Sequence, residues 1–255
     1  MPEVVQVIIG ELVGTFLLIL LGNGVVANVA LKRTLGNNGG WVAISVGWGF
    51  AVGIAVLLST ISGAHLNPAV TIGLLIANKK DAFVGSNFVY VPLYIVMQLI
   101  GAMLGQLFVY LAYFKEYQIT TEKDKILVTF STKPVNRSYG WNIATEIIAT
   151  FVLMLIVAGT MIIRNFMKEP IVSGFNNVTT PIILAIGVTV IGLGLGGPTG
   201  FAINPARDLG PRIMHAILPI KNKGNSDWKY AWVPITGPII GAALAGALVR
   251  LISIF

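Results

Sequence analysis

The chain has 255 residues, of which 55% are hydrophobic and 11% are charged, and its mean hydropathy is +0.83. One soluble core cannot bury so much apolar surface, so the composition predicts an integral membrane protein. The net charge of +7 comes from short segments between apolar runs, so we expect no nucleic-acid partner. Because there is no cysteine and only His65 and His215 represent histidine, disulfides and Cys- or His-rich metal sites are excluded. We expect no cofactor and no metal.

Six apolar runs predict membrane-spanning helices. Roughly 18 residues, at a rise of 1.5 Å each, cross a hydrocarbon layer of about 30 Å. In chain order the runs lie near residues 7–30, 41–61, 87–112, 143–163, 181–195 and 230–254. The first run is too long to be only a signal peptide, and we interpret it as the first helix.

A polar motif, SGAHLNPAV at residues 62–70, follows the second apolar run. Asn followed directly by Pro at the start of an apolar run is a signal for a helix N-terminus. The Asn side chain caps free amides, and Pro needs no amide at the first helical position. The motif therefore predicts a helix that begins after Asn67. Its apolar run ends before Asn78, after about half of the length that spans a membrane.

The second half of the chain repeats these features in the same order. The segment TGFAINPARD, residues 199–208, has the frame of the first motif, and its short apolar run extends through His215. Glu11 and Glu146 each precede a Thr-Phe pair by four residues in an apolar run. The separations Glu11–Glu146 and Asn67–Asn204 are 135 and 137 residues, which indicates an internal repeat. Each repeat has three spans, so the second enters the membrane in the opposite orientation.

The predicted fold class is an all-α membrane protein with six transmembrane helices and two re-entrant half-helices in two inverted repeats. We divide the chain into a first repeat at residues 1–114, a polar connecting loop at 115–140 and a second repeat at 141–255. The half-helices, which begin after Asn67 and Asn204, are expected to enter from opposite faces. Their N-termini would then meet near the midplane of the membrane.

The non-helical segments before the two half-helices predict a pore. Irregular backbone is tolerated at membrane depth only where it is buried in protein or lines a water-filled cavity. Carbonyl acceptors, two Asn amides and two positive helix ends would line this pore. The expected carbonyls belong to Gly63, Ala64, His65, Leu66, Gly200, Phe201, Ala202 and Ile203. The Asn-Pro-Ala motifs comprise Asn67, Pro68, Ala69, Asn204, Pro205 and Ala206.

Paired Asn-Pro-Ala motifs in inverted halves resemble the major intrinsic protein family of aquaporins and glycerol facilitators, over essentially the whole chain. The resemblance implies one pore per subunit and a homotetramer. The glycerol-conducting branch fits better, because the second motif continues as NPARD, where water-selective members usually have a small residue. Arg212, the pair Pro234-Ile235 and the segment TFSTKP at residues 129–134 are also similar to that branch.

The resemblance also implies a selectivity filter. In glycerol facilitators it consists of a Trp, a Gly, a Phe and the Arg after the second motif. On this chain these positions are Trp48, Gly192, Phe201 and Arg207. Two rings would contact a carbon backbone, while Arg207 and nearby carbonyls would bind hydroxyl groups, an arrangement that suits a polyol.

The register of the second helix departs from the family pattern. Trp48 precedes Asn67 by 19 residues, one fewer than the family leads us to expect. A shift of one residue turns a side chain by about 100°. Either a turn near the loop absorbs the deletion and Trp48 faces the pore, or Gly47 faces it and the filter is wider. We favour the first interpretation because GWGFAVG is so similar to the family pattern.

We therefore expect a passive channel for glycerol and other small uncharged solutes, with water, that excludes ions and protons and is not an enzyme. The alternatives are a water-selective aquaporin, a wider channel for small hydroxylated organic acids and a proton-coupled secondary transporter. A transporter would use Glu11 and Glu146 as proton relays. We prefer a structural role, in which each acid accepts hydrogen bonds from re-entrant loop amides. Asp208 is expected to hold the basic loop that follows the second motif.

Charge does not settle the orientation in the membrane. The resemblance implies a multi-pass protein of the cell membrane with both termini in the cytoplasm. In that orientation only Lys79, Lys80, Arg164, Lys168 and Arg250 lie on the cytoplasmic side. Ten other Lys and Arg residues lie outside, against the tendency of basic loops to stay in the cytoplasm.

Overall fold

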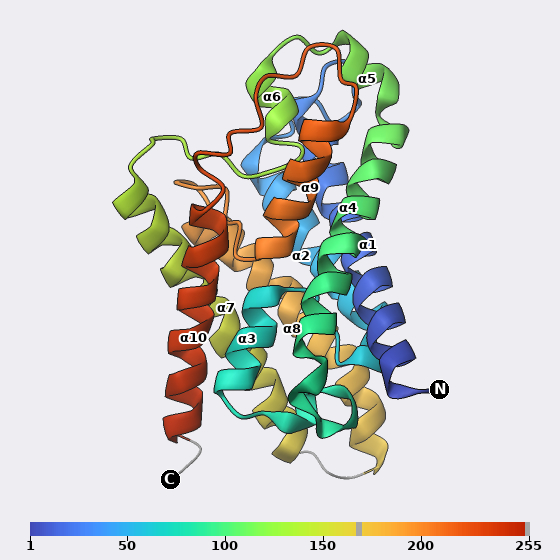
Figure 1. Cartoon of the computed structure of the whole chain (residues 1–255), viewed down its shortest axis with the longest axis vertical. Coiled ribbons are helices and arrows are strands. Elements are labelled where there is room, and N and C mark those ends of the chain that lie inside the picture. Colours follow the sequence, from blue (N-terminus) through green and yellow to red (C-terminus); the bar gives the residue numbers. More distant parts are fainter. Residues whose placement is uncertain (167–169, 253–255) are drawn as a thin grey trace.

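The computed structural model describes residues 1–166 and 170–252, and the regular structure in these ranges is entirely helical (Figure 1). Six long helices in them are apolar enough to span a membrane. They are α1 (Glu3–Ala30), α2 (Gly40–Leu58), α4 (Val91–Ala112), α7 (Tyr139–Phe166), α8 (Pro170–Leu195) and α10 (Val233–Ile252). The predicted all-α membrane fold is confirmed.

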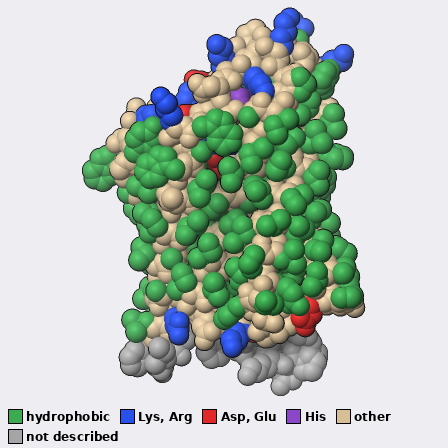
Figure 2. Space-filling view, viewed as in Figure 1, with side chains coloured by type: hydrophobic (Ala, Val, Ile, Leu, Met, Phe, Trp, Pro, Cys, Tyr) green, Lys and Arg blue, Asp and Glu red, His purple; other side chains and the backbone are tan. Residues whose placement is uncertain are grey.

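The surface is that of a multi-pass membrane protein. Apolar side chains cover the broad middle of the molecule, and Lys and Arg side chains gather at its two ends (Figure 2). On the outer faces of α2, α8 and α10, the side chains of Phe50, Val190 and Leu244 are 64%, 60% and 53% exposed. Lipid is the solvent that fits so extensive an apolar surface.

Some helix boundaries differ from the predicted ones. The fifth helix was predicted to begin at Pro181, but α8 begins at Pro170 and contains Pro181 in its interior. The segment NNVTT at 176–180, polar except for Val178, interrupts the apolar pattern and concealed this first part of the helix. Proline is tolerated inside membrane helices because neighbouring groups satisfy the freed backbone. The predicted end of the sixth run, Ile254, and Lys168 lie outside the described residues.

Two short helices begin at the Asn-Pro-Ala motifs. Helix α3 (Pro68–Ile76) and helix α9 (Pro205–Ile217) occupy opposite halves of the molecule (Figure 1). Their N-caps meet at the centre, because the Asn67 side chain donates to the carbonyl of Ile203 and the Asn204 side chain donates to that of Leu66, both at 2.8 Å. These are the two predicted half-helices, and they enter from opposite ends.

Helix packing follows the internal repeat. Helix α1 packs on α2 and α4, and α7 packs on α8 and α10 in the corresponding way. Each half-helix crosses to the other repeat, because α3 packs on α10 and α9 packs on α4. Small residues allow close contact: a Cβ atom on Gly105 would lie 2.5 Å from the carbonyl oxygen of Phe16, and one on Gly241 would lie 2.3 Å from that of Ile147.

The connecting loop forms a polar cap at one end of the molecule. Two short helices belong to it, α5 (Phe114–Ile119), which begins one residue before the loop, and α6 (Lys123–Leu127), near the top of Figure 1. Single 3-10 turns at Thr60–Ser62, Lys80–Ala82, Val84–Ser86 and Phe88–Tyr90 flank α3 and precede α4. The start of α1 and the end of α10 both lie toward the opposite, lower end.

Candidate pore

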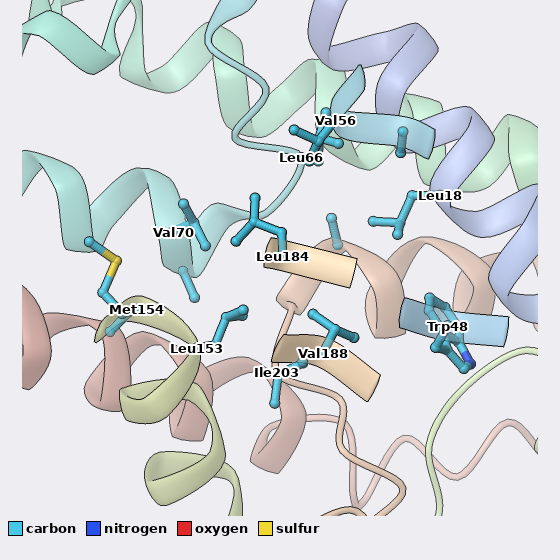
Figure 3. Packing of buried hydrophobic residues seen from close by; sticks show 14 of the residues in the cluster. Leu18, Trp48, Val56, Leu66, Val70, Leu153, Met154, Leu184, Val188 and Ile203 are labelled. Carbon is cyan, nitrogen blue, oxygen red and sulfur yellow. The ribbon is translucent and has the colours of Figure 1, made fainter. Parts of the chain in front are cut away.

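A cavity of about 160 Å³ lies where the two half-helices meet. One part of its wall is apolar and includes Leu18 of α1 and Leu184 and Val188 of α8 (Figure 3). Another part consists of the non-helical segments 63–66 and 201–203, together with Asn67, Asn204 and Arg207. The cavity wall is therefore apolar in one part and polar in another.

The two Asn side chains cap their own helices and bridge the repeats at the same time. The Oδ1 atom of Asn67 accepts from the amide of Ala69 at 2.9 Å. The Oδ1 atom of Asn204 accepts from the amides of Ala206 and Arg207 at 3.0 and 3.2 Å. Their Nδ2 groups bind the opposite loop, so each amide is oriented at both ends and both side chains border the cavity.

The loops that line the cavity have a strained backbone. Ala64 and Leu66 have φ values of 53° and 54°, and Phe201 and Ile203 have φ values of 38° and 46°. The strained positions alternate in the same way in both loops. Residues other than glycine seldom adopt positive φ, which costs on the order of 1–3 kcal/mol each and persists only where the surroundings enforce it.

Two buried carboxyl groups supply part of that enforcement. Glu146 accepts hydrogen bonds from the amides of Ala202 and Ile203 at 3.0 and 2.9 Å. Glu11 accepts from the amides of His65 and Leu66 at 3.0 and 2.8 Å. Glu11 also accepts from the side chains of Ser62 and Gln98, each at 2.7 Å. The acids thus satisfy loop amides at a depth where an unpaired amide costs several kcal/mol.

His65 is fixed on the cavity wall by contacts to both ring nitrogens. Its Nδ1 atom lies 3.2 Å from Thr71 Oγ1, and its Nε2 atom lies 3.0 Å from the carbonyl oxygen of Ala82. The ring stacks on Tyr94 with centroids 4.5 Å apart. These contacts hold the first loop against α3 and α4, and they leave the backbone of His65 at the cavity.

Three of the four expected filter residues border the cavity, and Gly192 lies behind one of them. The guanidinium carbon of Arg207 lies over the Trp48 ring, 4.2 Å from its centroid. Phe201 also lines the cavity. A Cβ atom on Gly192 would lie 3.0 Å from Phe201 Cζ and 2.9 Å from Ser45 Oγ. Gly192 therefore leaves room for the Phe201 ring.

Gly200, one of the residues whose carbonyl was expected to line the pore, does not border the cavity either, and a Cβ atom there would approach Thr132.

The register of α2 places Trp48 at the cavity. A Cβ atom on Gly47 would lie 2.7 Å from Val25, so Gly47 faces α1. The Trp48 ring lies against Gly22, where a Cβ atom would approach it to 2.4 Å. Helix α2 is continuous to Leu58, and the turn at Thr60–Ser62 follows it. That turn and the non-helical segment 63–66 lie between the end of the helix and Asn67.

Two buried donors at the cavity have no protein acceptor within the described ranges. They are Nη1 of Arg207 and Nε1 of Trp48. Arg207 is only 5% exposed, and both residues line the cavity. Buried polar groups are nearly always hydrogen-bonded, so these two donors are open to a partner that the described residues do not supply.

Asp208 has a structural role, but the segment that it holds differs from the expected one. It lies in the first turn of α9 instead of a loop, and it accepts from Arg212 Nε at 2.8 Å. It also accepts from the amide and hydroxyl of Thr132, each at 2.7 Å, and Arg212 donates to the carbonyl of Thr132 at 3.0 Å. Asp208 therefore attaches the connecting loop to α9. Its charge is paired with Arg212, which follows it by one helical turn.

Trp41, Ser45 and Thr132 are parts of this site that we did not assign from the sequence. Trp41, Ser45 and Trp48 lie at intervals of four and three residues, which places them along one face of α2. That spacing, read outward from Trp48, was the signal that would have identified the first two. Thr132 carried no comparable signal, because its partners lie about eighty residues away.

The helices, the opposed half-helices and the central cavity define a membrane channel built from two inverted repeats. The sequence model of the family described as Major intrinsic protein matches residues 1–249, and the chain belongs to this family.

Relatives match over nearly the full length. The chain is 49% identical to a "Probable glycerol uptake facilitator protein" of Thermotoga maritima, over 95% of this chain and 97% of the relative. It is also 49% identical to "Glycerol uptake facilitator protein 3" of Lactiplantibacillus plantarum, over 94% of each chain. The solved structure of the aquaglyceroporin from Plasmodium falciparum is similar, with a TM-score of 0.76, 32% identity and coverage of 97% of this chain and 99% of that one.

Proposed function

We propose that the protein is a passive channel for glycerol and other small uncharged polyols, with water. The observation that supports this most is the filter region, where a ring face, a second ring and an unpaired guanidinium donor meet at one cavity. Relatives at 49% identity carry the name of glycerol uptake facilitators. Trp48, Phe201 and Arg207 are the proposed filter, and Gly192 provides the space behind it.

A polyol has the chemistry that this filter complements. Its carbon backbone would contact the rings of Trp48 and Phe201, and its hydroxyl oxygens would accept from Arg207 Nη1. Its hydroxyl hydrogens would bind the carbonyls of residues 63–66 and 201–203, with Gly200 outside the lining. At the midpoint, the second hydrogen of each Asn67 and Asn204 amide would bind a passing oxygen. The hydrogen bonds that a solute gives up in water are thereby replaced in sequence.

Ions and protons meet an electrostatic barrier in the same cavity. Arg207 contributes a buried positive charge, and the N-terminal ends of α3 and α9 add partial positive charges at the midplane. Cations are repelled, and any ion loses hydration that the mostly apolar wall does not replace. We propose structural roles for Glu11 and Glu146, whose oxygens are used by loop amides.

We also propose the assembly and placement of the protein. The division into repeats 1–114 and 141–255 with a connecting loop at 115–140 is supported by the corresponding helix contacts in the two halves. The broad apolar band is consistent with lipid contact and with a homotetramer in the cell membrane. The start of α1 and the end of α10 lie at the same end, which we place in the cytoplasm.

The decisive experiment is light scattering from proteoliposomes that contain the purified protein. Swelling is followed in water, glycerol, urea, dihydroxyacetone and undissociated lactic acid, with protein-free liposomes as the control. We expect glycerol to enter much faster than through lipid alone while an imposed pH gradient persists.

Each alternative has its own result in this experiment. Glycerol entry at the rate of bare lipid, with rapid water flow, would assign the protein to the water-selective class. Faster entry of the hydroxy acid than of glycerol would indicate the wider channel. Uptake that collapses or requires the pH gradient would identify a coupled transporter.

A further inference from the structure

Trp41 makes two contacts with the filter region without lining the cavity itself. Its indole Nε1–H donates to the carbonyl of Gly192 at 2.8 Å. Its ring meets Phe201 edge to face, with centroids 5.6 Å apart and planes at 82°. Among the described residues, the cavity wall includes Phe201 and does not include Trp41. Any effect of Trp41 on a solute in the cavity therefore passes through its neighbours.

The end of α8 is shaped to admit both rings. A Cβ atom on Gly196 would lie 2.6 Å from Phe201 Cδ1 and 2.7 Å from Trp41 Cζ2. A Cβ atom on Gly192 would lie 3.0 Å from Phe201 Cζ. Trp41, Gly192 and Gly196 thus form a seat that borders the Phe201 ring. Without the indole, that seat would be open on one side.

The backbone around this seat needs external support. Phe201 has a φ of 38°, a conformation that its own side chain disfavours. The end of α8 reads GLGLGG at residues 192–197, and glycine backbone has more freedom to lose than other residues. The indole bond to the Gly192 carbonyl links this glycine-rich end to the first turn of α2. Trp41 is therefore placed to fix both the Phe201 ring and the glycine-rich end of α8 beside it.

We propose that Trp41 is a positioning residue that sets the solute-size limit of the channel by holding Phe201 in its seat. This inference rests on the proposed function for the choice of solutes. Trp41 acts through two parts of its side chain. The indole N–H orients the Gly192 carbonyl, and the ring orients Phe201. The two contributions are separable by mutation.

The experiment compares Trp41→Ala and Trp41→Phe with the wild type in proteoliposomes. The readout is the ratio of four-carbon to three-carbon polyol permeability, erythritol to glycerol, normalised to correctly assembled protein. We expect Trp41→Ala to raise this ratio by about two- to tenfold, the range expected for loss of one aromatic pair. Trp41→Phe keeps a ring edge and loses the N–H donor, so it should restore part of the wild-type ratio.

The controls separate positioning from general stability. Trp141, which is 78% exposed, supplies a matched surface variant, Trp141→Ala, that should leave the ratio unchanged. In a Phe201→Ala background, Trp41→Ala should produce no further change in the ratio, because the ring through which it acts is gone. Should Trp41→Ala fail to assemble, Trp41→Leu and Trp41→Phe give the same comparison.

Two results would overturn the inference. One is an unchanged ratio in assembled Trp41→Ala, and the other is an equal effect of Trp41→Ala with and without Phe201. Failure of the proposed function is recognised separately, as wild-type glycerol entry at the rate of bare lipid. In that case the ratio of urea to water permeability replaces the polyol ratio in the same cycle of variants, with the same expected loss of effect in Phe201→Ala.

Discussion

At residue 192, the absence of a side chain decides how much room the filter has. A Cβ atom there would approach Phe201 Cζ and Ser45 Oγ to 3.0 and 2.9 Å, closer than most real contacts. Ser45 and Trp41 occupy the side toward α2, so a larger residue at position 192 would displace Phe201 toward the cavity. Filter width therefore depends on a residue that does not itself line the pore.

Gly192→His should suppress glycerol permeation far more than water permeation. A three-carbon polyol must fit its backbone beside Phe201, whereas water needs only a narrow file of hydrogen-bond partners. We expect the glycerol-to-water permeability ratio to fall by about tenfold or more, since each 1.4 kcal/mol added to a barrier is a factor of ten. Stopped-flow light scattering on proteoliposomes gives both permeabilities.

Gly194→His is the matched control for this variant. A Cβ atom on Gly194 meets no atom within 4 Å, and the residue is exposed on the same end of α8. It should leave the ratio at the wild-type value. Equal effects of the two substitutions would show that the end of α8, and not the space at Gly192, controls solute passage.

The filter shows what sequence reasoning reaches at the residue scale. The motif and the family resemblance identified Trp48, Phe201 and Arg207, and the cavity brings these three together. The contact of Trp41 with Phe201 joins positions 160 residues apart, and no local pattern encodes it. The neighbourhood of Gly192 was likewise visible only once the helices were packed.

At the scale of elements, each re-entrant loop is attached to a spanning helix by one acid. Glu146 accepts from Ala202 and Ile203 with one carboxyl oxygen for each amide. A glutamine has a single acceptor oxygen, and its amide nitrogen would face the second backbone N–H as another donor. The loop backbone at φ values of 38° and 46° would then lose part of its support.

Glu146→Gln should reduce stability and assembly more than it changes solute preference. A buried amide left without an acceptor costs on the order of 1–3 kcal/mol. We expect a lower unfolding temperature in detergent and a smaller monodisperse fraction, with the glycerol-to-water ratio of the assembled protein nearly unchanged.

Glu3→Gln, at the exposed start of α1, is the matched control and should unfold like the wild type. A Glu146→Gln protein that is as stable as the wild type but transports nothing would contradict the structural role. It would instead indicate that the carboxyl group takes part in transport.

Elements were predictable where one local signal dominates. Asn-Pro before a short apolar run located both half-helices, because cap and proline act within a few residues. The predicted start of the fifth helix was wrong, because a polar interval and Pro181 resemble a helix boundary. Helix α8 nevertheless continues through both of them. The role of Asp208 depends on Thr132 and Arg212, so it required the folded connecting loop.

At the scale of the whole molecule, the polar cap is joined to α9 through His215. This residue lies in the last turn of α9, outside the six spanning helices. Its Nδ1 atom is 2.8 Å from Ser226 Oγ, and its ring meets Phe130 edge to face. Burial, followed by the charges of Lys223 and Arg212, lowers the pKa of His215 to about 4.

The protein should lose stability as the pH falls from about 6.5 to 4. In this window the unfolded chain binds a proton at His215 and the folded chain does not. The free energy of unfolding therefore has its full value above pH 6.5, and the part that depends on neutral His215 is lost as the pH falls toward 4. The full effect amounts to about 3 kcal/mol. Unfolding temperatures at pH 7.5, about 5.5 and about 4.5 should fall more steeply for the wild type than for His215→Gln. Parallel curves for the two proteins would contradict this assignment.

The crossed bonds from Asn67 to Ile203 and from Asn204 to Leu66 also have a consequence for biosynthesis. The first half of the chain leaves the ribosome with a donor and an acceptor whose partners have not yet been synthesised. At membrane depth such groups cost several kcal/mol while they remain unpaired. The Asn67 amide and the Leu66 carbonyl therefore lack these partners until residues 203 and 204 have been synthesised. Commitment to the native centre is consequently a late event, made when about four fifths of the chain has been translated.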